Sequence, residues 1–306
     1  MNSGTSKSPL QQMRRSWQLY LIMFLPMLVI FIFSYGPMFG LQIAFKDFRA
    51  RDGIWGSPWV GITHFRHFFG SFQFRRLITN TVGISFYQLL AGFPIPIILA
   101  ILVNECSSRT FKKSVQLITF APYFISTVVM TNMVIMFLSV YGGFVNNLIV
   151  SFGGDRVDFM AIPEYFKSIF VWSGIWQNMG YNSVIYIAVL STIDPSLYEA
   201  ATIDGASKFQ KIRFIDIPGI SPTIVILLIL NCGRIMSIGT ERILLMQNPL
   251  NMPSSDVIST YVYRMGLEQV QYSFSAAVGM FDSVVNTLLL VTVNQVARKL
   301  GETSLW

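Results

Sequence analysis

Four polar side chains lie in an otherwise apolar stretch in the last third of the chain. They are Asn231, Arg234, Ser237 and Glu241. On a helix, their spacing of three, three and four residues places all of them on one stripe. An arginine at the centre of a membrane helix costs roughly 2.5–3.5 kcal/mol on insertion scales. We therefore expect the stripe to face a bundle interior or a water-filled path, with Glu241 or a neighbouring helix neutralising Arg234.

Two kinds of chemistry fit this stripe. Its donors and acceptors suit contact with a hydroxyl-rich solute that crosses the membrane. A purely structural pair between helices fits the same residues, and the sequence leaves both open. Three polar residues in other apolar stretches are further candidates for the solute pathway: Asn132, Tyr181 and Asn182.

The sequence contains no pattern typical of catalysis. No Gly-x4-Gly-Lys-Ser/Thr phosphate loop occurs, so ATP hydrolysis by that route requires another subunit. No Ser/His/Asp arrangement or pair of carboxylates stands out, and no Cys/His cluster suggests a metal site. We expect a chain that is not an enzyme and that binds no cofactor itself.

The composition indicates a membrane protein. Of 306 residues, 53% are apolar and 12% are charged, whereas a soluble domain carries about 25% charged residues. The mean hydropathy is +0.54. The net charge of +7 comes from basic residues in short groups between apolar stretches. That placement argues against a nucleic-acid partner and is ordinary for chain segments at the ends of membrane helices.

Six stretches are long and apolar enough to cross a bilayer, which takes roughly 20 helical residues. They cover residues 19–41, 79–103, 115–140, 166–190, 220–243 and 276–296. No cleavage site follows the first stretch, so we expect an uncleaved helix. We predict an all-α membrane protein with a tail at 1–18, a six-helix transmembrane domain at 19–300 and a tail at 301–306. An even number of spans places both termini on one side, but the Lys and Arg distribution does not decide which side.

The loop at 191–219, between the fourth and fifth stretches, contains the start and stop signals of two short helices joined by a bend. Asp194 is a good N-cap, followed by a proline that suits the first helical position. Gly205 can adopt the left-handed conformation that ends a helix. Ser207 then caps a second piece, which Pro218 is expected to end. Such a loop is either a contact site for another protein or a simple linker.

The residues of this loop resemble a known motif. Glu199-Ala200-Ala201, then Gly205, then Ile215-x-Ile217-Pro218 resembles the EAA loop of ABC-importer permeases, whose pattern is EAA-x3-G-x9-I-x-L-P. The one departure is Ile217 in place of leucine. The residues around the motif, from Tyr198 to Ala206, look like the carbohydrate-uptake branch that includes maltose permeases. The stretches 255–267 and 276–279 look like its LplB-like subgroup of polysaccharide and oligosaccharide permeases.

This resemblance implies a type I ABC-importer transmembrane domain in the bacterial cell membrane, with the 191–219 loop and both termini in the cytoplasm. The loop would couple the chain to an ATP-binding subunit. The residues that match the coupling positions are Glu199, Ala200, Ala201, Asp204, Gly205, Ile215 and Pro218. The implied partners are a second permease subunit, two copies of an ATPase that hold ATP and Mg, an extracytoplasmic solute-binding protein, and a sugar, in particular an oligosaccharide.

Two other functions remain open at this point. The EAA loop alone also fits an ABC permease for another solute, such as a peptide or an amino acid. A secondary transporter that works alone would usually show internal repeats and intramembrane carboxylates, and neither is clear in this sequence.

Overall fold

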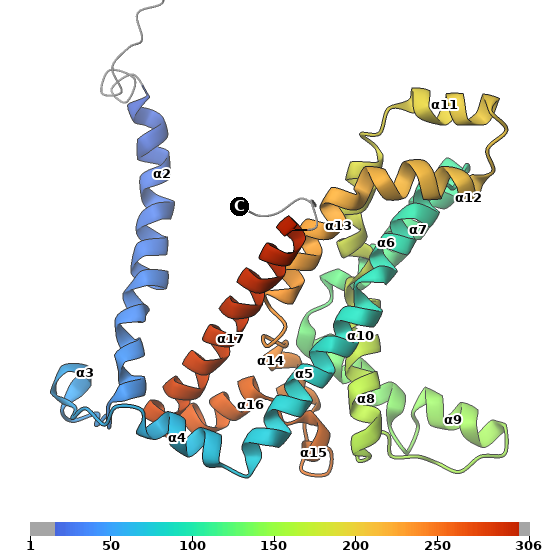
Figure 1. Cartoon of the computed structure of the whole chain (residues 1–306). Coiled ribbons are helices and arrows are strands. Elements are labelled where there is room, and N and C mark those ends of the chain that lie inside the picture. The colour runs from blue at the N-terminus through green and yellow to red at the C-terminus, as the bar shows by residue number, and fades with distance from the viewer. Residues whose placement is uncertain (1–15, 300–306) are drawn as a thin grey trace, which may run out of the picture.

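The computed structural model describes residues 16–299, and this part of the chain is almost entirely helical. Within it, the only strand-like pairing is an isolated antiparallel bridge between Lys46 and Trp59. Long helices run between two ends of the molecule, and short helices gather at those ends (Figure 1). The predicted all-α fold class is confirmed.

The first long rod stands apart from the other helices over most of its length and joins them at the end next to α3 (Gly53–Gly56) and α4 (Thr63–Gly70) (Figure 1). It comprises α2 (Trp17–Ile30), the π-helical η1 (Phe31–Tyr35) and the 3-10-helical η2 (Gly36–Phe45). No side chain of α2 or η1 is buried. A helix that is apolar on every side must be covered by lipid or by another polypeptide, so this rod is built for a membrane.

The remaining long helices form a bundle around α10 (Pro163–Leu190), which contacts most of the others. Gly180 of α10 lies where α7 crosses, because an added Cβ would be 2.1 Å from the carbonyl oxygen of Thr119. Small residues of this kind let membrane helices approach closely. The other long elements are α5 (Gln73–Gly92), α6 (Pro94–Asn104), α7 (Arg109–Phe120), α8 (Thr127–Leu138), α13 (Ile217–Cys232) and α17 (Tyr272–Lys299).

Short helices close the end of the bundle opposite α11 (Pro195–Ile203) (Figure 1). A buried ion cluster joins two of its segments: Asp256 accepts hydrogen bonds from Arg76 at 3.1 Å and from Arg264 at 2.9 Å. Asn80 donates to the Asp256 carbonyl oxygen at 3.1 Å, which fixes the first half of α5 to the same turn. The short helices are α3 (Gly53–Gly56), α4 (Thr63–Gly70), α9 (Phe144–Ser151), α15 (Met252–Ser255) and α16 (Ile258–Tyr263).

By length and composition, four helices of the described chain can cross a membrane, or five if one bent pair counts as a span. The bent pair is α7 with its 3-10 extension, followed by α8, at an angle of 101°. The helix α10 is 28 residues long, but its polar residues make it less apolar than the helices that qualify. The count of six spans therefore stays a prediction. The four helices are Trp17–Phe45, Phe72–Asn104, Lys208–Cys232 and Tyr272–Lys299.

Two predicted helices are wrong in their extent. The stretch 115–140 is broken, because Pro122 lies in a 3-10 turn and Ser126 caps a new helix. The stretch 220–243 is not one helix, because α13 ends at Cys232 and a new short helix, α14 (Thr240–Met246), begins after an irregular segment.

Pro218 also does not end a helix, contrary to expectation. The chain runs from α12 (Lys208–Lys211) through a π-turn, η4 (Ile212–Asp216), directly into α13. Pro218 lies in the first turn of α13, where a missing N–H is tolerated.

Candidate functional sites

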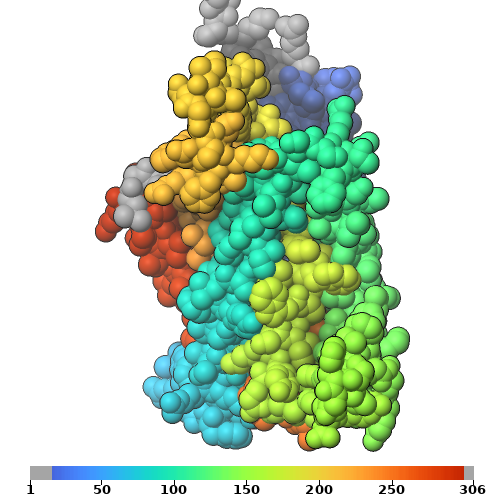
Figure 2. Space-filling view, turned by 90° about the vertical axis from the view of Figure 1, so that its right-hand side faces the viewer, coloured from blue at the N-terminus to red at the C-terminus, as the bar shows by residue number. Residues whose placement is uncertain are grey.

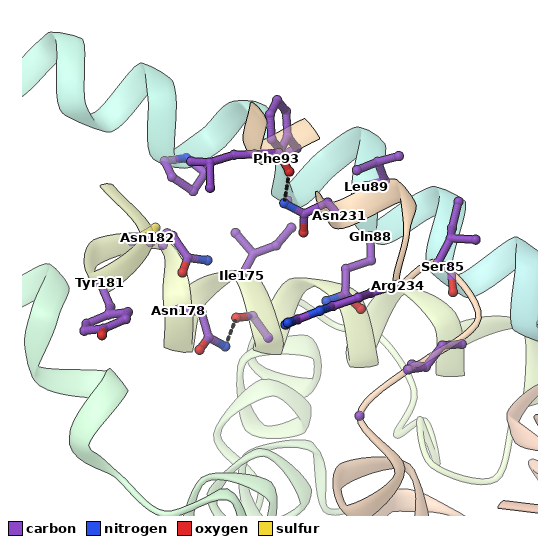
Figure 3. A pocket seen from close by; sticks show the side chains of 18 of the residues that line it. Ser85, Gln88, Leu89, Phe93, Ile175, Asn178, Tyr181, Asn182, Asn231 and Arg234 are labelled. Atoms are coloured by element: carbon purple, nitrogen blue, oxygen red, sulfur yellow. Dashed lines mark hydrogen bonds between the residues drawn. The ribbon is translucent and has the colours of Figure 1, made fainter. Parts of the chain in front are cut away.

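A cavity of about 740 Å³ opens among α5, α10, α13 and the segment that follows α13 (Figure 3). Five of the predicted pathway residues line it: Tyr181, Asn182, Asn231, Arg234 and Ser237. Ser85, Gln88 and Asn178 add further polar groups. The cavity therefore combines polar donors and acceptors with an apolar wall, as solute-binding sites do.

A second hollow of about 560 Å³ adjoins the cavity and shares Gln88, Asn178 and Gly239 with it. Glu241 and Arg242 line this hollow. The rings of Tyr123, which lines the hollow, and Tyr181, which lines the cavity, stack with centroids 3.8 Å apart. Together the two spaces form one polar region inside the bundle.

The four residues predicted to form one stripe around Arg234 do not lie on a single helix. Most of them nevertheless lie together. Asn231 is in the last turn of α13, Arg234 and Ser237 are in the irregular segment, and Glu241 is in the first turn of α14. Glu241 lines the second hollow rather than the cavity and forms no ion pair with Arg234 among the described residues. Asn132 lies on α8, lines neither space, and donates to the carbonyl oxygen of Val128 at 2.9 Å.

The irregular segment is held in place by α17. Asn286 accepts a hydrogen bond from the backbone N–H of Met236 at 3.0 Å and donates to the Ser237 hydroxyl at 3.0 Å. The cavity amides are fixed as well: Asn178 donates to the Gly174 carbonyl oxygen at 2.8 Å, and Asn231 donates to that of Leu227 at 2.7 Å. The amide oxygens of these two side chains remain as acceptors for hydroxyl groups.

The sequence analysis did not single out several polar residues of this region, among them Gln88, Tyr123 and Arg242. Gln88 has a visible signal, since it interrupts an apolar stretch. Arg242 has none, because it falls at the edge of a predicted span, where basic residues are common. Tyr123 becomes recognisable only once the break after Pro122 is known.

The second candidate site is the 191–219 loop, which forms the bent hairpin that the sequence predicts. The Asp194 carboxylate accepts from the backbone N–H of Ser196 at 2.9 Å, and this bond lowers the pKa of Asp194 so that the cap stays ionised. Gly205 has a φ of +74° and ends α11. Ser207 then caps α12 in a capping box with Gln210.

A tyrosine fastens this hairpin to the membrane bundle. The Tyr198 hydroxyl donates to the buried carboxylate of Asp216, at the base of α13. Burial and this bond raise the pKa of Tyr198, so the hydroxyl keeps its proton at physiological pH. The second oxygen of the Asp216 carboxylate has no partner. The bond between Tyr198 and Asp216 therefore connects α11 to the bundle.

Replacing Tyr198 with phenylalanine is expected to loosen the hairpin. The change leaves both oxygens of a buried carboxylate without a partner, which costs about 1–3 kcal/mol. Hydrogen exchange of 194–206 in detergent should become faster, and the melting temperature should fall. The matched variant Tyr263→Phe, whose hydroxyl has no hydrogen bond among the described residues, should change neither quantity. Unchanged exchange in Tyr198→Phe would contradict this role.

The hairpin, in yellow and gold, projects at the top of the molecule in Figure 2 and carries the predicted coupling residues. Glu199, Ala200, Asp204, Gly205 and Pro218 are exposed, while Ala201 and Ile215 are half-buried. Apolar side chains beside them are exposed too: Ile203 by 86%, Phe209 by 71% and Phe214 by 68%. Exposed apolar side chains on a projecting element are typical of a protein contact site.

Comparison with known proteins decides the family. Residues 92–302 match the family model described as "Binding-protein-dependent transport system inner membrane component". The chain belongs to this family. It is a membrane-spanning transport permease and not an enzyme.

Curated relatives of this permease align over nearly its whole length. Protein LplB of Bacillus subtilis is 37% identical over 306 residues, which is 100% of this chain and 96% of the relative. The polygalacturonan/rhamnogalacturonan transport system permease protein YteP of Bacillus subtilis is 40% identical over 286 residues, covering 93% of this chain and 89% of YteP.

Solved structures agree with the sequence comparison. A chain of a bacterial ABC transporter that imports the acidic polysaccharide alginate superposes with a TM-score of 0.88 and 41% identity, covering 95% of this permease and 98% of that chain. A chain of the alginate transporter in complex with its pentasaccharide-bound periplasmic protein gives a TM-score of 0.89 at 39% identity, covering 97% and 99%. The type I ABC-importer fold expected from the EAA loop is confirmed.

Proposed function

We propose that this permease forms half of the translocation pathway of an ATP-driven importer for an oligosaccharide. The observation that carries the proposal is the cavity among α5, α10 and α13, whose amide, hydroxyl and guanidinium groups suit hydroxyl-rich solutes. Tyr181 in its wall offers an aromatic face for the C–H surface of a sugar ring. YteP and the alginate transporter, which carry saccharides, support this substrate class.

The partners follow from the family and from the surface of the chain. The proposed assembly has a second permease subunit, two copies of an ATPase that bind ATP and Mg, and an extracytoplasmic solute-binding protein. The isolated α2 rod supports a second membrane subunit, because lipid or another chain must cover its apolar surface. The periplasmic protein in the alginate complex supports the binding protein.

The hairpin at 191–219 is the proposed connection to the ATPase. Closure of the ATPase pair would move the two hairpins of the membrane dimer together and so switch the bundle between inward-facing and outward-facing states. This function requires the hairpin to lie in the cytoplasm. The start of α2 and the end of α17 lie at the same end of the molecule as α11 (Figure 1), which supports both termini being cytoplasmic in a bacterial cell membrane.

Uptake by cells tests the substrate class. Deleting the gene should abolish the uptake of one or more labelled oligosaccharides, while uptake of amino acids and of short peptides stays unchanged. Expression of the intact chain should restore the lost uptake. Loss of peptide or amino-acid uptake alone would overturn the proposal and favour a permease for that solute class.

A further inference from the structure

The polar region of the bundle holds two arginines that no carboxylate of the described chain neutralises. Arg234 lines the cavity and Arg242 lines the adjoining hollow. The ion pairs of the described residues are formed by Asp47, Asp52 and Asp256, so neither guanidinium lies within 4.0 Å of a carboxylate oxygen. Glu241 is the one acidic residue in the lining of either space, and it is exposed.

Arg242 is held firmly in its place. It is only 8% exposed, and its guanidinium carbon lies 3.9 Å from the centre of the Phe170 ring. The group also packs against Gly174, where an added Cβ would be 2.1 Å from a guanidinium nitrogen. The guanidinium therefore fits in this place only because residue 174 has no side chain. No hydrogen bond to this guanidinium is found within residues 16–299.

Burial of the Arg242 guanidinium is costly, whereas Arg234 is exposed. Removing a cation from water carries a large penalty unless an anion or several acceptors replace the lost hydration. The face of Phe170 replaces only part of it, and no acceptor of the described chain meets the N–H edge of this guanidinium, whose residue lines the hollow. A planar carboxylate is the group that matches this edge, through two parallel hydrogen bonds.

We infer that the transported oligosaccharide carries carboxylate groups, and that Arg234 and Arg242 bind these carboxylates as the chain passes through the bundle. The inference rests on the proposed function and names the substrate class of that site. Gln88 and Asn178 line both spaces, so a sugar chain that extends from one space into the other keeps hydroxyl partners between the two cations. Uronic-acid oligosaccharides have this chemistry.

The test uses the complete importer in proteoliposomes with saccharide probes that differ only in charge. The probes are trigalacturonate, its carboxyl-reduced neutral counterpart, and a neutral trisaccharide bearing one phosphate. The variants are Arg234→Gln and Arg242→Gln, and Arg66→Gln is the matched control, an exposed arginine on α4 that lines neither space. Transport is measured at saturating binding protein, together with ATP hydrolysis.

The intact importer should transport trigalacturonate at least about 10-fold faster than the neutral counterpart. Each pathway variant should lose roughly 10-fold or more of this preference, as expected for loss of a hydrogen bond to a charged group, because transport of trigalacturonate should fall more than transport of the neutral saccharide. Arg66→Gln should keep the preference. Arg234 has no packing contact of the kind that holds Arg242, so Arg234→Gln remains informative if Arg242→Gln fails to fold.

Three results would overturn the inference: equal or faster transport of the neutral saccharide, a preference for the phosphate-bearing probe, or equal loss for all probes in the arginine variants. Transport of the neutral saccharide alone would leave the proposed oligosaccharide import standing. Absence of transport for every saccharide, with a peptide transported instead, would overturn the proposed function itself.

Discussion

Replacing Gly205 with proline should abolish transport by the assembled importer while the permease still inserts in the membrane. Gly205 has a φ of +74°, whereas proline fixes φ near −65°. Its N–H also donates to the Thr202 carbonyl oxygen at 3.1 Å, and proline has no such donor. The end of α11 must therefore change direction, and Glu199 and Ala200 with it. We expect solute uptake to fall at least about 100-fold, a loss of roughly 3 kcal/mol in coupling.

Gly205→Asn is the matched control for this prediction, because asparagine tolerates the left-handed conformation and keeps the N–H. It should retain most of the uptake. Western blotting of membranes should show similar amounts of both variants. Full uptake with Gly205→Pro at normal levels would show that the bend has no part in coupling.

Reversing the charge of Glu199 should separate ATP hydrolysis from transport. Its side chain is exposed on α11 and has no partner among the described residues, so the substitution Glu199→Lys does little to the fold of the chain. If the residue faces an ATPase subunit, a like charge or an unpaired charge at that contact costs several kcal/mol. We expect uptake to fall at least about 100-fold, and the ATPase to copurify poorly.

Glu268→Lys makes the same change at an exposed glutamate near the opposite end of the bundle, close to α16. It should leave both uptake and copurification near those of the unmodified chain. Equal losses in the two variants would mean that the effect of Glu199→Lys reflects general charge rather than a docking contact.

Local chemistry explains why the hairpin was predicted well. Its ends depend on residues within a few positions of one another: the Asp194 cap, the left-handed Gly205 and the Ser207 capping box. Short-range signals of this kind are readable in a sequence. The fold class was equally accessible, because a chain with so few charges needs an apolar solvent.

The break after α13 depends on distant contacts, so the sequence could not show it. Gly233 lies against Leu290 of α17, where an added Cβ would be 2.6 Å from a leucine methyl group. Asn286 of the same helix bonds the Met236 N–H and the Ser237 hydroxyl, which replaces helical hydrogen bonding at this point. Helical periodicity therefore placed Arg234 and Glu241 on one stripe that does not exist.

The position of Arg242 could not be predicted for a related reason. Its guanidinium occupies the space left by a glycine about 70 residues earlier in the chain, beside the ring of Phe170. No local pattern pairs these residues. The polar residues of α10 also depend on the tertiary structure, because Asn178 and Asn182 face the cavity rather than lipid. These residues lower the hydropathy of the helix.

Site-directed crosslinking of the hairpin is the most direct measurement of its role as the link to an ATPase. Single cysteines would replace Ile203 or Phe209, both exposed, after Cys106 and Cys232 are changed to serine; a cysteine at the exposed Phe152, near the opposite end, is the control. We predict that the hairpin cysteines crosslink to an ATP-binding subunit in membranes and react only with reagents that enter the cytoplasm. If the hairpin cysteines never capture that subunit, or are labelled from outside intact cells, coupling through this loop is contradicted.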